Sequence, residues 1–325
     1  MEKDASAMAL TYAGDFANYW DNSADNYADH TFSLNAYASP TDLFTFYFDA
    51  SAGKLHDNRG EGSSKGTNFA SRREPDEYDI DNVSLLLDIG RDSARMGVEI
   101  ELSRTDIDYT NNRIETQFRD RDESFVAGRV YVKATGKTRF FAEVSSEEFE
   151  YETPPLLQDS LDGDEQGFAV GVTWDATGKT TGTIKVGSED KDFDVASRRS
   201  DDTFVWDVDV TWSPRTYSHV FLSGSSEALE TNGTGAFIEA TNFSVSWVHG
   251  WSDRMRSNVA FSVGENSYEG DPRNDDLSNF SVGFDYDWQR WVTIGASVSR
   301  NDRDSNQSQF DYDRNIFSVS LDMSL

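Results

Sequence analysis

One stretch of this chain alternates so regularly that it limits the fold more than any other feature. From Phe204 to Trp212 the sequence reads FVWDVDVTW. Successive side chains of a strand point to opposite sides, so the apolar residues share one face, and the two aspartates and Thr211 share the other. An apolar band with aromatic residues at both ends, spread over roughly 26 Å of strand, is typical of a transmembrane β-barrel strand.

The composition alone would mislead. The net charge of −30 is typical of a very soluble or partly disordered acidic chain. The charges, however, fall at alternate positions, and no run of about 18 apolar residues is present, which excludes membrane-spanning helices. Cysteine is absent, so the chain has no disulfide framework, thiol nucleophile or thiolate metal site. The acidity also argues against nucleic acid and anionic headgroups as direct electrostatic partners.

Short turn signals alternate with longer polar segments along the whole chain. Outer-membrane barrels have short periplasmic turns and longer extracellular loops, so we predict one barrel domain over 1–325, all-β and up-and-down, with both termini at the short-turn end. The pattern predicts about sixteen antiparallel strands. Their expected spans are 6–19, 30–38, 42–54, 82–90, 94–108, 123–134, 138–151, 165–175, 179–193, 203–213, 216–229, 241–250, 254–268, 277–288, 291–304 and 313–325.

Tryptophans mark one edge of the predicted lipid-facing band. A soluble sandwich also alternates, but it rarely repeats Trp at strand ends beside turns. Six of the eight tryptophans adjoin short turns, where their rings would lie at the periplasmic interface. These predicted girdle residues are Trp174, Trp212, Trp247, Trp251, Trp288 and Trp291. The last strand, NIFSVSLDMSL, resembles the terminal signal read by the barrel assembly machinery, although it ends in Leu325 instead of the commoner Phe.

The opposite face predicts a polar lumen that carries both signs of charge. A sixteen-stranded barrel is wide enough for an aqueous channel unless something plugs it, and the segment 55–80 is long enough to fold inward. The charges either brace the wall as ion pairs or contact a transported solute, and we favour bracing. The predicted lumen residues are Tyr47, Asp49, Asp88, Glu99, Glu101, Arg129, Lys133, Arg139, Glu143, Lys185, Asp207, Asp209, Asp285, Asp287 and Asp322.

Aromatic residues on the lumen face have two interpretations. Their rings are natural platforms for sugar rings, but they also fill space against a barrel wall, and packing is the interpretation we favour. The residues concerned are Tyr37, Tyr47, Phe125, Tyr131, Phe141 and Phe221.

Catalytic and metal sites are not indicated. The acid-rich segments 159–165 and 269–276 hold oxygen donors of the kind calcium uses, but neither has the ordered twelve-residue EF-hand loop, and solvated surface charge is the favoured interpretation. The four scattered histidines suggest no Ser/His/Asp constellation. We therefore expect no enzyme activity, no cofactor and no metal.

Several hairpins resemble a known family. VGVTWDATGKTTGTIKVG, VDVTWSPRTYSHVFLSGS and VGFDYDWQRWVTIGASVSR each end an apolar strand in a T-W or Y-D-W unit, turn tightly, and return through small residues. Together with the opening GDFANYWDNSADNYADHTFSLNAYASPT, they resemble the outer-membrane β-barrel porin family associated with exopolysaccharide and capsule export. Some relatives are thought to have eighteen strands, which leaves room for a further hairpin within 1–40 or 55–82.

The resemblance implies a function and partners. It implies an outer-membrane pore for a secreted polysaccharide in a Gram-negative bacterium, working with a periplasmic polysaccharide-export lipoprotein that has no membrane-spanning pore of its own. It implies no catalytic residues. We expect a monomeric barrel in contact with lipid and lipopolysaccharide, and a secretion signal removed before Met1. The alternatives are a general diffusion porin for small solutes and a sealed structural or adhesion barrel.

Overall fold

The structure is a computed structural model that describes residues 6–59, 72–91, 93–154, 159–175, 178–195, 198, 201–230 and 235–324. Almost all of the described chain is β-strand. The strands are β1 (Ser6–Ala17), β2 (Tyr27–Ala38), β3 (Phe44–Asp57), β4 (Asp76–Ile89), β5 (Met96–Tyr109), β6 (Arg121–Thr135), β7 (Thr138–Tyr151), β8 (Gly163–Asp175), β9 (Thr180–Phe193), β10 (Asp201–Arg215), β11 (Ser218–Glu230), β12 (Phe237–Ser252), β13 (Met255–Tyr268), β14 (Asn274–Gln289), β15 (Val292–Ser305) and β16 (Tyr312–Met323).

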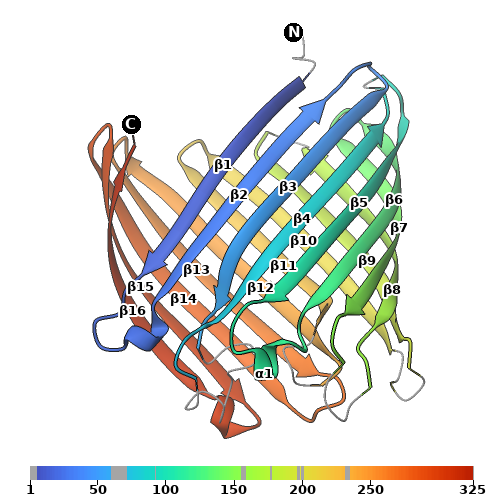
Figure 1. The fold of residues 1–325 in the computed structure, drawn as a ribbon. Helices are drawn as coiled ribbons and strands as arrows, with labels where there is room; N and C mark the ends of the chain where they lie inside the picture. The colour runs from blue at the N-terminus through green and yellow to red at the C-terminus, as the bar shows by residue number, and fades with distance from the viewer. Residues whose placement is uncertain are drawn as a thin grey trace.

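The strands form one antiparallel sheet in sequence order. Each strand pairs with the next, from β1 to β16, which is the up-and-down topology predicted from the alternation. Figure 1 shows the sheet curling into a barrel-like wall of tilted strands, with both chain termini at one end. That end carries the short turns and is called the short-turn end below. The opposite end, the long-loop end, carries α1 (Arg113–Thr116) (Figure 1).

The prediction of sixteen strands is confirmed, whereas several predicted strand boundaries were wrong. β2 begins at Tyr27 instead of 30, β3 continues to Asp57 instead of 54, and β4 begins at Asp76 instead of 82. These added ends carry charged residues such as Glu77, Asp79 and Asp81 at outward positions, and an apolar outer face is required only within the thickness of the lipid. Of the predicted loop 55–80, residues 60–71 lie outside the described residues, as does Leu325.

The two edges of the sheet are β1 and β16. Within the described part of the chain, β1 pairs only with β2 and β16 only with β15. Almost every residue of both strands is exposed, on the lumen side as well as on the outside.

The outer face is apolar and exposed, as a lipid-facing surface should be. On β8, Phe168 and Val170 are 56% and 43% exposed, while the inward-facing Ala169 between them is only 6% exposed. A soluble protein rarely shows so much contiguous apolar surface. The described residues contain no helix that is long and apolar enough to cross a membrane.

Candidate functional site: the lumen wall

The predicted lumen residues all lie on the inward face of their strands. On β3, for example, Tyr47 and Asp49 alternate with the outward Phe46 and Phe48, and the same parity holds on the other strands. Whether these residues contact a solute stays a prediction.

One part of this wall is held by ion pairs. Arg129 of β6 lies between Glu99 of β5 and Glu143 of β7: its Nη1 is 2.8 Å from Glu99 Oε2, and its Nε donates to Glu143 Oε2 at 2.7 Å. Arg139 Nη1 is 2.9 Å from Glu99 Oε1, and Lys185 Nζ is 3.5 Å from Glu143 Oε1. We call these five residues the ionic brace. Their mutual pairing is the arrangement that the bracing interpretation predicts.

Two aromatic side chains lie flat beneath the ionic brace. Tyr131 is 2% exposed and donates from its hydroxyl to Asp88 Oδ1 at 3.0 Å, and Phe141, 7% exposed, lies 4.7 Å below the Arg129 guanidinium. Gly90 and Gly97 leave the space that the Tyr131 hydroxyl occupies, because a Cβ on either glycine would lie 2.2 Å from the tyrosine oxygen. For these two aromatic residues, packing against the wall is confirmed.

Other aromatic residues keep a face open to the lumen. Tyr47 is 43% exposed and stacks on Tyr37 at a ring separation of 6.3 Å. Phe221 of β11 is 42% exposed and stacks against His219, whose Nδ1 is 2.8 Å from Ser213 Oγ. These rings remain available to a solute.

The inward acids outside the brace differ in their partners. Asp287 accepts from Thr293 Oγ1 at 2.7 Å and lies 3.3 Å from Arg256 Nη1. Asp207 faces Lys185 across the β9–β10 pair. Among the described residues, no basic side chain lies within 4 Å of Asp209 or Asp285. Those two acids are therefore not held in ion pairs among the described residues, although Arg256 is the register partner of Asp285.

A cavity opens from the lumen wall near the short-turn end. It has a volume of about 720 Å³ and spans β6 to β11. We call it the short-turn pocket; its inward lining includes Lys133, Arg139, Thr173, Thr183, Asp209 and Phe221. Sequence reasoning named the charged members and Phe221 but missed the threonines. The signal was present, because both threonines share the parity of the inward charges.

The predicted tryptophan girdle lies at the short-turn end of the strands. Trp212, Trp288 and Trp291 are more than half exposed, and Trp247 Nε1 donates to Ser218 Oγ at 2.9 Å. This placement suits an interface, while its depth in a membrane stays a prediction.

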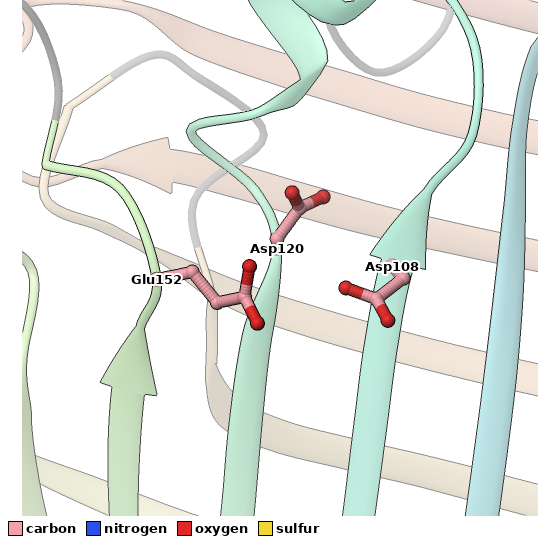
Figure 2. Close-up of side chains that lie close together, drawn as sticks. All are labelled: Asp108, Asp120 and Glu152. Carbon is pink, nitrogen blue, oxygen red and sulfur yellow. The ribbon is translucent and has the colours of Figure 1, made fainter.

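A cluster of acids that the sequence did not predict lies at the long-loop end. Asp108, Asp120 and Glu152 lie close together at neighbouring strand ends (Figure 2), and one carboxylate oxygen of each residue lies within 4.8 Å of those of the other two. The buried Asp120 already has partners. Its Oδ1 accepts from the Tyr109 amide and from Arg113 Nη1, each at 2.8 Å.

Arg113 of α1 supplies the positive charge that this cluster needs. Its Nη2 is 2.5 Å from Asp120 Oδ2, and the hydrogen bond to this carboxylate raises the pKa of the Arg113 guanidinium above its ordinary value. The cluster therefore anchors the loop between β5 and β6, and the lumen is the stronger candidate site.

Comparison with known proteins supports the interpretation of the chain as an outer-membrane β-barrel. The sequence profile of a family described as "Putative beta-barrel porin 2" matches residues 4–325. No curated protein matches the chain.

The fold is similar to solved outer-membrane barrels at very low identity. The FrpB iron transporter from Neisseria meningitidis is 8% identical with a TM-score of 0.52, over 93% of this chain and 59% of its own. The copper transporter OprC is 8% identical with a TM-score of 0.54, over 98% of this chain and 61% of its own. The open form of the ferric-catecholate import receptor Fiu from E. coli K12 is 10% identical with a TM-score of 0.50, over 99% and 70%.

These similarities concern the fold alone. The chain spans about 59% and 61% of the length of the first two barrels. The matched family and the compared structures are porins, transporters and receptors rather than enzymes. The porin family and the barrel fold support an outer-membrane location in a Gram-negative bacterium.

Proposed function

Because the chain belongs to the family described as "Putative beta-barrel porin 2", we propose that it forms an outer-membrane pore for export of a secreted exopolysaccharide. The observation that carries this proposal is the short-turn pocket. It offers threonine hydroxyls, which both donate and accept hydrogen bonds, beside the exposed ring of Phe221. Hydroxyl groups next to an aromatic face are suited to a sugar ring.

The proposed mechanism is passive conduction. The polymer moves through a hydrated lumen whose polar groups replace part of its water contacts without holding it tightly enough to stall it. The sequence carries no nucleotide-binding motif, so the driving force comes from elsewhere. We assign the polymer's delivery to a periplasmic polysaccharide-export lipoprotein. The barrel itself would be monomeric, inserted by the barrel assembly machinery and surrounded by lipid and lipopolysaccharide.

A general diffusion porin is the second candidate. Asp209 and Asp285 favour it, because lumen acids that form no ion pair with a described residue suit a water-filled path for small cations. A sealed surface barrel would need the lumen to be filled.

The test is to delete the gene and measure polysaccharide at the cell surface and inside the cell, with a complemented strain as control. Export predicts loss of surface polysaccharide, with periplasmic or intracellular retention or arrested synthesis. Unchanged surface polysaccharide would overturn the proposal and leave the diffusion porin or the sealed barrel.

Complementation with variants tests the pocket itself. Phe221→Ala removes the exposed ring from the lumen, and Phe243→Ala removes a similarly exposed ring from the outer face of β12. We expect the first variant to lower surface polysaccharide and the second to restore it, at equal amounts of folded barrel in the outer membrane. Equal export by both variants would remove Phe221 from the path.

A further inference from the structure

A line of hydroxyl groups starts in the short-turn pocket and crosses the lumen wall from strand to strand. Thr173 of β8 is the register partner of Thr183 of β9, and their Oγ1 atoms are 3.2 Å apart. Thr183 is in turn the partner of Asp209 of β10, and Asp209 the partner of Ser223 of β11. All four residues line the short-turn pocket.

The line continues without a break over the next strands. Ser223 is the partner of Ser244 of β12, with their hydroxyl oxygens 2.7 Å apart, and Ser244 is the partner of Ser262 of β13. Ser262 pairs with Asn279 of β14, whose carboxamide donates to Asn301 of β15. We call the eight residues from Thr173 to Asn301 the polar track.

The polar track climbs from one end of the barrel to the other. Thr173 lies near Asp175, where β8 ends at the short-turn end, whereas Asn301 lies near Ser305, where β15 ends at the long-loop end. The reason is the strand tilt, because a line of register partners runs perpendicular to tilted strands and so winds around the barrel (Figure 1). The polar track is therefore a screw-shaped path through the membrane.

A second cavity lies at the far end of this path. It has a volume of about 390 Å³, and Ser262, Asn279 and Asn301 line it. We call it the long-loop pocket. Ser244 is the one member of the polar track that lines neither pocket, and it joins the two. Two independent cavities thus begin and end the same line of side chains.

The chemistry of the polar track differs from that of the ionic brace. Arg129, Glu99 and Glu143 direct their charges at each other, whereas the polar track has Asp209 as its only charged member. Hydroxyl and carboxamide groups both donate and accept, so they can match sugar hydroxyls in either role. Neighbouring strands lie about 4.8 Å apart, so the polar track offers a new polar group at each such step, a length comparable with one hexose unit in an extended glycan.

We propose that the polar track binds a neutral, polyhydroxylated chain and guides it along this screw path between the two pockets. The proposal rests on the proposed export function and names the substrate class and its route. Many weak contacts in series let the chain advance by exchanging one hydrogen bond for the next, which avoids a single tight site.

The experiment measures current blockade in planar lipid bilayers that hold the purified full chain. The probe is maltoheptaose, and a polyethylene glycol of the same hydrodynamic size, which lacks hydroxyl groups along its length, is the control solute. Thr183→Val, Ser244→Ala and Asn279→Leu remove polar groups from the track. Ser281→Ala and Ser299→Ala are matched controls, because both serines face the lumen on β14 and β15 but pair one step off the polar track.

We expect maltoheptaose to dwell longer in the pore than the polyethylene glycol does. Each substitution on the polar track should shorten the maltoheptaose dwell time by about 2- to 10-fold, the effect of one lost hydrogen bond, and the two control substitutions should leave it unchanged. Equal effects of track and control substitutions, or equal dwell times of the two solutes, would overturn the proposal.

The outcomes separate this proposal from the export function. If the track substitutions shorten the dwell time while the deletion strain keeps its surface polysaccharide, the polar track binds sugar chains in a diffusion porin and the export function is overturned. If the deletion strain loses surface polysaccharide while the track substitutions leave the dwell time unchanged, the export function is supported and the proposed role of the polar track is overturned.

Discussion

Arg129 is the residue on which the ionic brace depends. It contacts two glutamates that are themselves only 7% and 8% exposed, and it also covers the ring of Phe141. Charges this far from water are stable only while they are paired, since removing one partner leaves the other desolvated without compensation. The brace therefore ties the wall together from β5 to β9, and its charges are paired with one another instead of standing free.

Replacing Arg129 with Met should destabilise the barrel by about 2–4 kcal/mol, less than for a fully buried pair because the arginine is partly exposed. The measurement is the urea midpoint of unfolding in micelles, followed by tryptophan fluorescence. Glu101→Gln is the control, because no basic side chain of the described residues lies within 4 Å of Glu101. Adding Glu99→Gln and Glu143→Gln to the Arg129 variant should recover most of the loss, because the other two partners, Arg139 and Lys185, are about one third exposed and can be solvated. No recovery would mean that the charges are not what the arginine stabilises.

Gly97 is needed for a close approach and not for its backbone freedom. In Gly97→Ala, the new Cβ would lie 2.2 Å from the Tyr131 oxygen, so the rigid ring must leave its place on the wall. We expect a loss of about 1–3 kcal/mol in the same unfolding assay. Gly128→Ala on the outer face of β6 meets only Val144 Cγ2 at 4.0 Å and should be tolerated. Equal tolerance of both would contradict the packing of Tyr131.

Asp209 should influence which ions pass. It lies exposed in the short-turn pocket, where its negative charge offsets part of the positive charge of Lys133 and Arg139, and it forms no ion pair within 4 Å with a described residue. Asp209→Lys should therefore lower the cation preference, read as the reversal potential under a salt gradient. Asp313→Lys makes the same charge change on the outer face of β16 and should leave the potential unchanged. A reversal potential that Asp209→Lys does not move would take this residue off the conduction path.

At the scale of single residues, sequence parity was enough to predict which side chains face inward. It was not enough to predict their partners or exposure. Tyr131 of β6 packs without a clash only because Gly90 and Gly97, at the turn between β4 and β5, have no side chain. The polar track depends on the register of eight strands together with their tilt. Neither register nor tilt follows from one strand's sequence.

Among the elements, the edge strands β1 and β16 each have one side without a paired strand in the described part of the chain. Lipid provides no hydrogen-bonding partner, so an unpaired strand edge in the bilayer is very costly. In an up-and-down sheet with an even number of strands, the first and last strands run antiparallel, so they are able to pair with each other. We expect β1 and β16 to close the barrel in the membrane.

Hydrogen exchange of the backbone amides tests this closure. In lipid nanodiscs, the amides of β1 and β16 should exchange as slowly as those of β8, which pairs on both sides. Fast exchange confined to the amides of β1 that point away from β2, and to those of β16 that point away from β15, would show that the two edges stay open.

Most elements could be predicted from the sequence because lipid imposes a strict alternation over the membrane thickness. β7 was predicted as 138–151 and is Thr138–Tyr151. The prediction was wrong at LHD of β3 and DEYDID of β4, because the outward positions there are charged or polar and the apolar residues Leu55 and Ile80 lie on the inward face, so the alternation reverses. There the partner strand, and not the solvent, determines where pairing ends.

At the scale of the whole molecule, the chain is a wall with two unlike faces. Its outside is an apolar band, and its inside combines the ionic brace on one part with the hydroxyl-rich polar track, whose single charged member is Asp209, on another. This division explains how a chain with a net charge of −30 belongs in a membrane, since the charges lie inside the barrel, in the loops and on the outer face only towards the long-loop end. It also explains why composition alone predicts the wrong class of protein.

If this wall encloses an open, water-filled pore, the barrel conducts ions, and an electrical measurement tests this directly. The purified full chain is added to a planar lipid bilayer in potassium chloride, with heat-denatured protein as control. We expect stepwise current increases as single barrels insert, with a preference for potassium over chloride. Insertion without any current above that of the bare bilayer would mean a sealed lumen and would overturn the proposed pore.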